Sequence, residues 1–474
     1  MSAAAPPDLP PHPDRLFPAD PAARAVARRL YARVQDLPII SPHGHVPVRW
    51  LADNTPFTDP TSLLISPDHY IFRLLHAAGV PLADLGVGGS ALDEADSRRA
   101  WQVFCDHWTI FRGTPSRFWM ESVLSTIFGV TERPGPGTAD AIYDRVAACL
   151  TLDEFRPRQL FKAFGIDVLA TTDDPCDDLA HHAELRDDDA FDGRVVPTFR
   201  PDRYLEPGGP DFPRLMDDLA AASGEDTGEF AGYVLALAAR RRHFIEHGAV
   251  SADHSHADVV TIELSDDETH RLYRTARAGD ATPDEATALR RHMLGEMARM
   301  SVEDGLVMTL HPGVHRNHHT PTLSAFGPDS GHDIPTTVEF TRGLHDLLQR
   351  FGTADGFHLV LFTVDETVFS REIAPLAGFY PAVYAGVPWW FLDAPEAIRR
   401  FREAVTETLG FYRTSGFIDD TRAFCSIPAR HDMSRRLDTS YLARLVVEHR
   451  LEEDEAAETV TDLVTSIPRR VFKL

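Results

Sequence analysis

The 474-residue chain has few cysteines, and their placement excludes several kinds of site. The four cysteines are Cys105, Cys149, Cys176 and Cys425. None belongs to a CxxC pair, so we expect neither a zinc knuckle nor a disulfide framework. Free thiols are typical of a reducing compartment, and we therefore expect a cytoplasmic protein.

The sequence also lacks a long apolar run, and no stretch is long enough to span a bilayer. From Met1 to about Pro21 the chain is rich in alanine and proline and has no apolar core of a signal peptide. We interpret residues 1–35 as an N-terminal arm and helix. Residues 36–474 are then expected to form one catalytic domain.

Positive charge is scarce: 47 basic residues stand against 72 acidic ones, which gives a formal net charge of -25. A surface this acidic argues against nucleic acids and anionic membranes as partners. An anionic ligand would need arginines placed locally to overcome the general field. With 43% hydrophobic residues, the chain can nevertheless bury a large core.

Short apolar runs recur along the chain, and each one ends in polar or reactive residues. The runs are residues 37–40, 167–172, 195–199, 250–252, 306–310, 357–362, 382–385 and 417–418. Helical patterns lie between several of them, and the segments from Thr282 and from Asp393 look like helix starts with proline at the first position. Strands that alternate with amphipathic helices predict a parallel sheet.

Eight such strands, each with reactive residues at its C-terminal end, predict a (β/α)8 TIM barrel with its active site on that face. The alternative is a doubly wound open sheet, which usually gathers its chemistry at one crevice. The stretch from about residue 79 to 158 shows no clear strand. We interpret it as a helical insertion after the first strand.

A possible metal site begins with His43 and His45, which follow the first apolar run. Residues two apart on a strand point to the same face, so both imidazoles can reach one ion. Asp420, after the last run, could complete an open site for a divalent metal. The alternative is a pair of partly buried histidines that bond to backbone carbonyls.

Asp420 and Arg422 are expected to share a face in the same way. The guanidinium of Arg422 either keeps the carboxylate ionised or binds the carboxylate or hydroxyls of a substrate. A structural ion pair is the alternative. Arg200 and His311 follow apolar runs on separate strands, and Trp389 could form a flat wall for a sugar.

Nine short strings cover nearly the whole chain: LPIISPHGH, SPDHYIFRLLHAAGV, LATTDDP, VPTFRPD, SADHSH, LHPGVHRN, WWF, DDTRAF and ARHD. In this order they resemble the uronate isomerase (glucuronate isomerase) family of the amidohydrolase superfamily. The resemblance implies an amidohydrolase-type barrel and an aldose-ketose isomerase. The implied reaction interconverts D-glucuronate and D-fructuronate, and D-galacturonate and D-tagaturonate.

The resemblance also implies roles for individual residues. His43, His45 and Asp420 match the family's metal ligands. The middle strands end in arginine and aspartate rather than in further ligands, so one divalent ion, zinc, is implied. The residues that match positions around the substrate are Tyr70, Arg200, Asp253, His311, Trp389 and Arg422.

The implied chemistry opens the sugar ring and moves a hydrogen between C2 and C1. Asp420 is the candidate base, Tyr70 steers or protonates an oxygen or C1, and Asp253 assists ring opening. The metal, with His311 or Arg422, stabilises the developing oxyanion. A hydride shift between the carbons is the alternative to proton transfer.

Recognition of the substrate's C6 carboxylate is assigned to Arg200, which lies on a different strand from the metal ligands. The expected partner is a small hexuronic acid, and a homo-oligomer is expected. Two other functions stay open: a metal-dependent hydrolase or lactonase of the same superfamily, and a non-catalytic sugar-acid binding protein. His315, His318 and His319 could bind a second metal, although their polar, proline-flanked loop favours a solvated segment.

Overall fold

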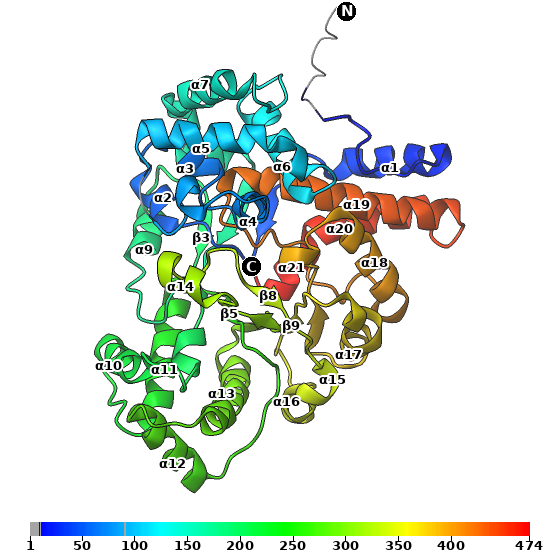
Figure 1. Ribbon diagram of the computed structural model, residues 1–474. Helices are drawn as coiled ribbons and strands as arrows, with labels where there is room; N and C mark the ends of the chain where they lie inside the picture. The colour runs from blue at the N-terminus through cyan, green and yellow to red at the C-terminus, as the bar shows by residue number, and fades with distance from the viewer. Residues whose placement is uncertain (1–8, 10, 90–91) are drawn as a thin grey trace, which may run out of the picture.

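The computed structural model describes residues 9, 11–89 and 92–474. Its architecture is mixed α/β, with strands in the interior and helices around them (Figure 1). The strands are β1 (Ile39–Ser41), β2 (Ile166–Ala170), β3 (Arg194–Val196), β4 (Thr198–Phe199), β5 (Ser251–His254), β6 (Val307–Leu310), β7 (Val314–His315), β8 (Ile334–Pro335), β9 (Leu359–Leu361) and β10 (Val383–Ala385). Apart from the antiparallel β7–β8 ribbon, the paired strands in the described residues run parallel.

The parallel strands follow the order β1-β2-β3 in one sheet and β4-β5-β6-β9-β10 in the other. The two sheets adjoin at Pro197, inside the run that the sequence predicts as one strand over residues 195–199. Proline has no backbone N–H to donate, so the ladder is interrupted there. A parallel bridge between Asp173 and Phe199 continues the pairing across this break.

Seven of the eight predicted runs overlap observed parallel strands, but the prediction of a strand at residues 417–418 is wrong for the described structure. The backbone around this segment still bonds to both neighbours. Ser415 N donates to Ala385 O at 2.9 Å, and His45 N donates to Thr421 O at 3.0 Å. Positive φ angles at Gly416 (71°) and Asp420 (42°) interrupt the extended backbone, so no continuous ladder forms.

Among the described residues, only helices and turns lie between β1 and β2. They are α2 (Val48–Asp53), α3 (Pro60–Leu64), α4 (His69–Ala77), η1 (Leu82–Leu85), α5 (Glu94–Asp106), η2 (Trp108–Phe111), α6 (Pro115–Ser122), η3 (Val123–Ile127), α7 (Ala139–Leu150), η4 (Asp153–Phe155) and α8 (Pro157–Ala163). This helical segment begins at Val48, before the expected boundary near residue 79. Its core, around the fully buried Trp101 and Phe104, is continuous with Ile39 of β1 and with Ile166 and Leu169 of β2.

The remaining helices cover the strands. They are α1 (Pro21–Val34), α9 (Ala180–Asp187), α10 (Phe212–Ser223), α11 (Phe230–Glu246), α12 (Asp266–Arg277), α13 (Pro283–Asp304), α14 (Thr320–Phe326), α15 (Phe340–Gly343), α16 (His345–Phe351), α17 (Ala374–Phe379), α18 (Pro395–Leu409), α19 (Ile427–Val447), α20 (Glu453–Val464) and α21 (Ser466–Phe472). Short turns between them are η5 (Asp202–Leu205), η6 (Glu366–Val368), η7 (Phe369–Ile373), η8 (Trp390–Leu392) and η9 (Phe424–Ser426). α1 lies along α19 at one edge of the molecule (Figure 1).

The two helix starts expected from sequence differ in how they are capped. α13 begins with the full capping box between Thr282 and Glu285. α18 begins at Pro395 as expected, but no side chain caps it, because the N-cap residue is Ala394; Asp393, one residue earlier, pairs with a buried arginine. All four cysteines are free. No helix in the described part of the chain is both long enough and apolar enough to cross a membrane.

Candidate functional site

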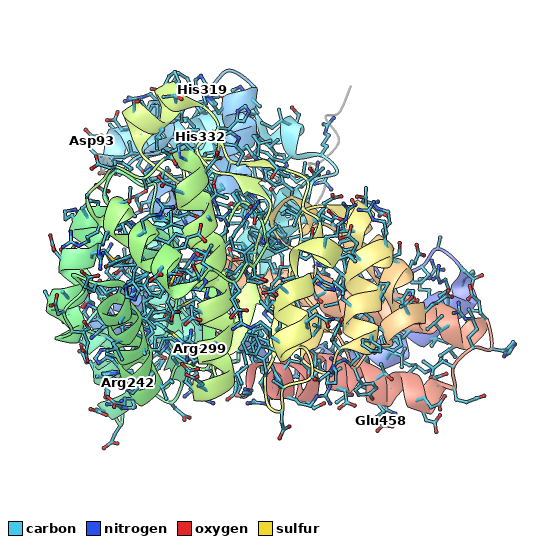
Figure 2. The ribbon with its side chains drawn as sticks, turned by 90° about the horizontal axis from the view of Figure 1, so that it is seen from below. Asp93, Arg242, Arg299, His319, His332 and Glu458 are labelled. Carbon is cyan, nitrogen blue, oxygen red and sulfur yellow. The ribbon has the colours of Figure 1, made fainter. Side chains whose placement is uncertain are left out.

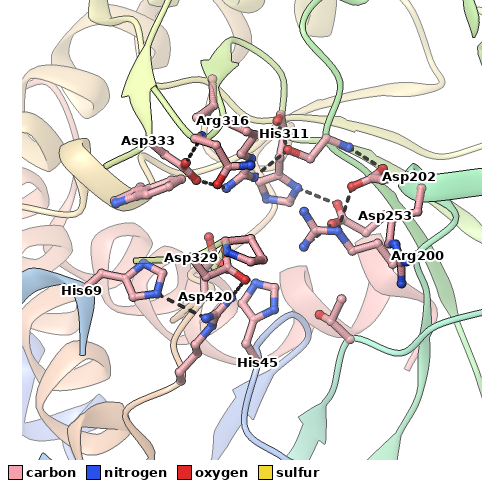
Figure 3. Close-up of a pocket in the computed structure, with 18 of the residues that line it drawn as sticks. His45, His69, Arg200, Asp202, Asp253, His311, Arg316, Asp329, Asp333 and Asp420 are labelled. Carbon is pink, nitrogen blue, oxygen red and sulfur yellow. Dashed lines mark hydrogen bonds and ion pairs between the residues drawn. The ribbon is translucent and has the colours of Figure 1, made fainter. Parts of the chain in front are cut away.

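The C-terminal ends of the parallel strands open into a cavity of about 1010 Å³ (Figure 3). The structure brings together all nine side chains that the sequence singled out, although they come from distant parts of the chain. They are His43, His45, Tyr70, Arg200, Asp253, His311, Trp389, Asp420 and Arg422. A volume of this order is at the upper end for pockets that bind small molecules.

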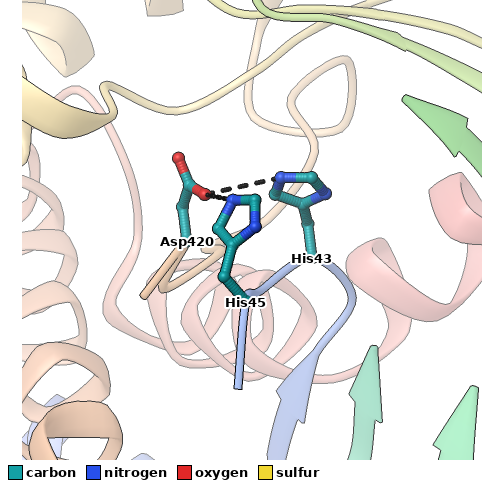
Figure 4. A group of neighbouring side chains, drawn as sticks. All are labelled: His43, His45 and Asp420. Atoms are coloured by element: carbon teal, nitrogen blue, oxygen red, sulfur yellow. Dashed lines mark ion pairs between the residues drawn. The ribbon is translucent and has the colours of Figure 1, made fainter. Parts of the chain in front are cut away.

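His43, His45 and Asp420 converge at one side of this cavity (Figure 4). Oδ1 of Asp420 lies 2.9 Å from Nε2 of His45 and 3.4 Å from Nε2 of His43. Burial lowers the pKa of His45 to about 4, so its imidazole is neutral and has a free lone pair at neutral pH. Two imidazole nitrogens and a carboxylate oxygen form a donor set that fits a divalent metal such as zinc.

His311 lies beside this group, and its imidazole is oriented by a buried aspartate, Asp253. Its Nδ1 is 2.6 Å from Oδ1 of the fully buried Asp253, and Thr309 Oγ1 donates to the same oxygen at 2.6 Å. The carboxylate therefore holds the proton on Nδ1 and leaves a lone pair on Nε2, which is buried and has no partner among the described residues. His43, Asp253 and His311 form a second possible metal group that shares His43 with the first.

Arg200 is enclosed by carboxylates of the protein itself. Its Nε donates to Asp202 at 2.9 Å, and its Nη1 lies 3.5 Å from Asp253. Although burial opposes the charge, these two carboxylates hold the pKa of Arg200 above its usual range. Because its charge is already balanced internally, Arg200 has little capacity left for the carboxylate of a ligand.

Two other arginines face the cavity with one carboxylate partner each. Arg316 pairs with the buried Asp333 at 2.9 Å, and Arg422 pairs with the half-exposed Asp329 at 2.9 Å. Nη1 of Arg422 also donates to Nε2 of His69 at 3.2 Å. Burial lowers the pKa of His69 to about 3, so this histidine is neutral and can accept that bond. These arginines can exchange an internal partner for an anionic ligand more readily than Arg200 can.

Sequence reasoning missed four of these residues. His69 and Arg316 stand inside strings that carry the family resemblance, next to Tyr70 and after the strand that leads to His311, so a signal was available. Asp329 and Asp333 lie on a loop between β7 and β8 without a recognisable pattern. Only the folded chain brings these two carboxylates to the arginines.

Tyr70 is positioned by the start of α4. The side chain of Asp68 caps this helix and accepts a hydrogen bond from Tyr70 N at 2.8 Å. Burial raises the pKa of the phenol above its usual range, so Tyr70 stays protonated and can donate. Trp389 packs edge-on against His311, with ring centroids 4.7 Å apart, and forms an apolar wall of the cavity.

Backbone strain is concentrated in this cavity. Asn317, Asp329, Trp390 and Asp420 have φ angles of 56°, 61°, 49° and 42°, the left-handed region that side-chain-bearing residues rarely adopt. Such conformations persist where the surrounding structure enforces them, and they cluster at functional sites.

The histidine-rich loop after β7 forms no comparable metal group in the described residues. His315 and His318 have ring centroids 5.2 Å apart, while Nδ1 of His319 bonds to Thr322 Oγ1 at 2.8 Å. His319 N also donates to His332 Nδ1 at 3.1 Å, and both histidines lie at the periphery of the molecule (Figure 2). This geometry favours the solvated loop over the second metal site.

Comparisons with known proteins agree with one another. A family model described as glucuronate isomerase matches residues 22–472. A uronate isomerase of Cutibacterium acnes is 54% identical over 97% of this chain and 98% of its own length. The crystal structure of a glucuronate isomerase from Caulobacter crescentus superposes with a TM-score of 0.96 at 49% identity, covering 98% of this chain and 97% of that one. The crystal structure of a uronate isomerase from Thermotoga maritima superposes with a TM-score of 0.91 at 27% identity, covering 97% of this chain and 99% of that one. The chain therefore belongs to the glucuronate isomerase family.

Proposed function

We propose that this protein is a metal-dependent uronate isomerase that interconverts D-glucuronate and D-fructuronate, and D-galacturonate and D-tagaturonate. The observation that carries the proposal is the convergence of His43, His45 and Asp420 in a cavity whose arginines can hold an anionic sugar. The relatives named as uronate isomerases, at about half identity over the full chain, support the same reaction.

One divalent ion, zinc, is proposed to be held by His43, His45 and Asp420. When bound, the metal supplies Lewis-acid stabilisation of negative charge on a sugar oxygen. The chain's own contribution is to fix the imidazoles directly after β1 and the carboxylate on the neighbouring segment, which bonds to them through the backbone of His43 and His45. This arrangement leaves one side of the group open to the cavity.

Asp420 is the proposed base for the proton on C2. Burial opposes its ionisation, but the adjacent imidazoles of His43 and His45 hold the pKa of Asp420 well below its usual range. The carboxylate is therefore ionised at neutral pH and can accept a proton. Arg422, two residues further on, places positive charge where the oxyanion of an enediol would develop.

Tyr70 and His311 are proposed to direct protons at the sugar's oxygens. Tyr70 is protonated and donates, whereas Nε2 of His311 accepts, because Asp253 holds the proton on Nδ1. The complete burial of Asp253 favours this positioning role over a direct part in ring opening. An acceptor and a donor that line one cavity suit a reaction that moves a proton between neighbouring carbons.

The C6 carboxylate of the substrate is proposed to bind Arg316 rather than Arg200. The guanidinium of Arg316 stacks on Trp390 with its central carbon 5.2 Å from the ring centroid, and its side chain is 34% exposed. A planar, partly exposed guanidinium of this kind can form a forked pair with a carboxylate. Arg200 then balances the charge of Asp253 next to the metal ligands.

We also infer that the parallel strands close into a (β/α)8 barrel of the amidohydrolase type. The support is the continuity of backbone contacts around the ring of strands. The segment after α18 bridges to β10 through Ala385 and Thr414, and it meets β1 where Asp420 N donates to His43 O at 3.3 Å. Closure of this kind would bring the two histidines after β1 next to Asp420, which comes from the other end of the chain.

The test is a coupled assay of D-glucuronate, D-galacturonate and a panel of sugar lactones on protein whose metal has been removed and restored. We expect turnover of uronates only, in proportion to bound zinc. His43→Ala should lower metal content and turnover together. His358→Ala is the matched control, because His358 bonds to Val471 O away from the cavity. Lactone hydrolysis without isomerisation would support a hydrolase instead.

A further inference from the structure

A fully buried arginine lies behind the tyrosine of the active site. Arg430, near the start of α19, has a side chain that is 1% exposed. The central carbon of its guanidinium lies 3.6 Å from the ring centroid of Trp119 and 4.9 Å from that of Tyr70. The two rings meet edge to face, with centroids 5.1 Å apart. The charge of Arg430 is thus enclosed by the rings of Tyr70, which lines the cavity, and Trp119, both of which belong to the helical segment between β1 and β2.

The charge of Arg430 is balanced from a third part of the chain. Its Nη1 pairs with Asp393, whose side chain is 4% exposed and which follows η8. Its Nε donates to Ser426 Oγ at 2.9 Å. The ion pair therefore joins α19, the loop before α18 and, through the ring of Tyr70, the start of α4.

The hydrogen bonding of this pair is incomplete. Nη2 of Arg430 and Oδ1 of Asp393 are both buried, and neither has a partner among the described residues. A buried donor on a charged group that lacks a partner is costly, so such a group needs an explanation.

A second buried arginine–aspartate pair, between Arg402 of α18 and Asp438 of α19, behaves differently. All three nitrogens of Arg402 donate, to both oxygens of Asp438 and to Thr414 Oγ1. Buried arginine–aspartate pairs in this fold can therefore be satisfied. Other buried arginines, such as Arg241 and Arg290, also have a nitrogen without a partner, and Arg430 differs from them in lying against the ring of Tyr70.

We propose that Arg430 is a positioning residue for Tyr70, with its spare Nη2 donating to the tyrosine's oxygen directly or through one water. An oxygen that accepts from the guanidinium must turn its own O–H away from it. Tyr70 then presents its proton to an oxygen of the sugar in the cavity. Burial raises the pKa of Tyr70, and Arg430 is the charge that most opposes this effect, which makes the phenol a better donor.

The inference rests on the proposed isomerase reaction, and a double-mutant cycle tests it. The metal-loaded enzyme is compared with Tyr70→Phe, Arg430→Met and the double variant, and kcat, KM and zinc content are measured for D-glucuronate. Arg430→Met should lower kcat about tenfold to a hundredfold, the range expected for loss of one hydrogen bond from a charged donor. KM and zinc content should stay within about twofold of wild type. In the Tyr70→Phe background the same change should cost less than about threefold, because its target is gone.

Arg402→Met is the matched control, because it also removes a buried arginine–aspartate pair, here between α18 and α19, without touching Tyr70. Its effect should be the same in both backgrounds. If Arg430→Met does not fold, Arg430→Lys takes its place in the cycle, since lysine keeps the charge but loses the fork. An equal loss for the Arg430 variant in both backgrounds overturns the proposal. A wild-type enzyme that does not isomerise uronates overturns the proposed function and this inference with it.

Discussion

Separate replacement of Arg316 and Arg200 by methionine distinguishes recognition of the substrate carboxylate from internal charge balance. Arg316 has one carboxylate partner and a side chain that is 34% exposed. Arg200 is 22% exposed and lies between Asp202 and the fully buried Asp253. Methionine retains much of the apolar stem of arginine but removes its charge and its donors.

The expected magnitudes differ for the two positions. Loss of a charged hydrogen bond to the substrate costs roughly 1.5–3 kcal/mol, which is about 10- to 150-fold in kcat/KM. Arg316→Met should therefore weaken D-glucuronate turnover by this factor, mainly through KM. Arg200→Met leaves Asp253 buried without its counter-ion, a change that typically costs roughly 3–5 kcal/mol of stability. That variant should melt earlier and lose activity on every substrate.

The assay measures kinetics on D-glucuronate and uses D-glucose as alternative substrate or competitive inhibitor. Zinc content and melting temperature are measured on the same preparations. Arg413→Met is the control, because Arg413 bonds only backbone carbonyls among the described residues. Equal weakening of the acid and the neutral sugar by Arg316→Met would refute the assignment. If Arg200→Met lost activity on the uronate but not binding of the neutral sugar, recognition of the C6 carboxylate would be assigned to Arg200.

Three further predictions follow from the same cavity. In heavy water, proton transfer should place deuterium from the solvent at C1 of the ketose, as NMR can detect; complete retention of the C2 label at every conversion would favour a hydride shift. Asp329→Asn should lower KM for D-glucuronate severalfold, because Arg422 loses its internal competitor, and a raised KM would contradict this. Burial raises the pKa of Asp173 to about 7. Between roughly pH 4 and 7 this carboxyl group is therefore ionised in the unfolded chain but still protonated in the native state. The native state loses stability as pH rises through that window, so Asp173→Asn should melt higher relative to wild type at pH 8 than at pH 5; an equal difference at both pH values would contradict it.

The parallel strands were predictable because their sequence signal is local. Each strand is a short apolar run, and its side chains are buried on both faces, as in the uninterrupted burial of β6 and β9. The predicted strand at residues 417–418 failed because two positive φ angles, at Gly416 and Asp420, break the ladder there. Glycine adopts a positive φ readily, but an aspartate rarely does, so the conformation of Asp420 could not be expected from its residue type.

The pairing of charges in the cavity was not predictable in the same way. His43 and His45 belong together by their spacing alone, because alternate residues of a strand share a face. Arg200, in contrast, showed a plausible place at a strand end but no sign of the two aspartates that neutralise it. Whether an arginine binds a ligand or balances the protein's own charge depends on partners that lie far away in sequence, such as Asp333 for Arg316.

By itself, the sequence determined the parallel α/β pattern, nine of the side chains that line the cavity and the resemblance to uronate isomerases. These follow from periodicity, from residue spacing and from strings that stand intact along the chain. Only the tertiary structure decided which arginines keep a partly exposed charge, which proton of His311 is held, and that Arg430 lies behind Tyr70. The physical reason is that burial and Coulomb interactions act through space over a few ångströms, whereas a sequence records neighbours along the chain alone.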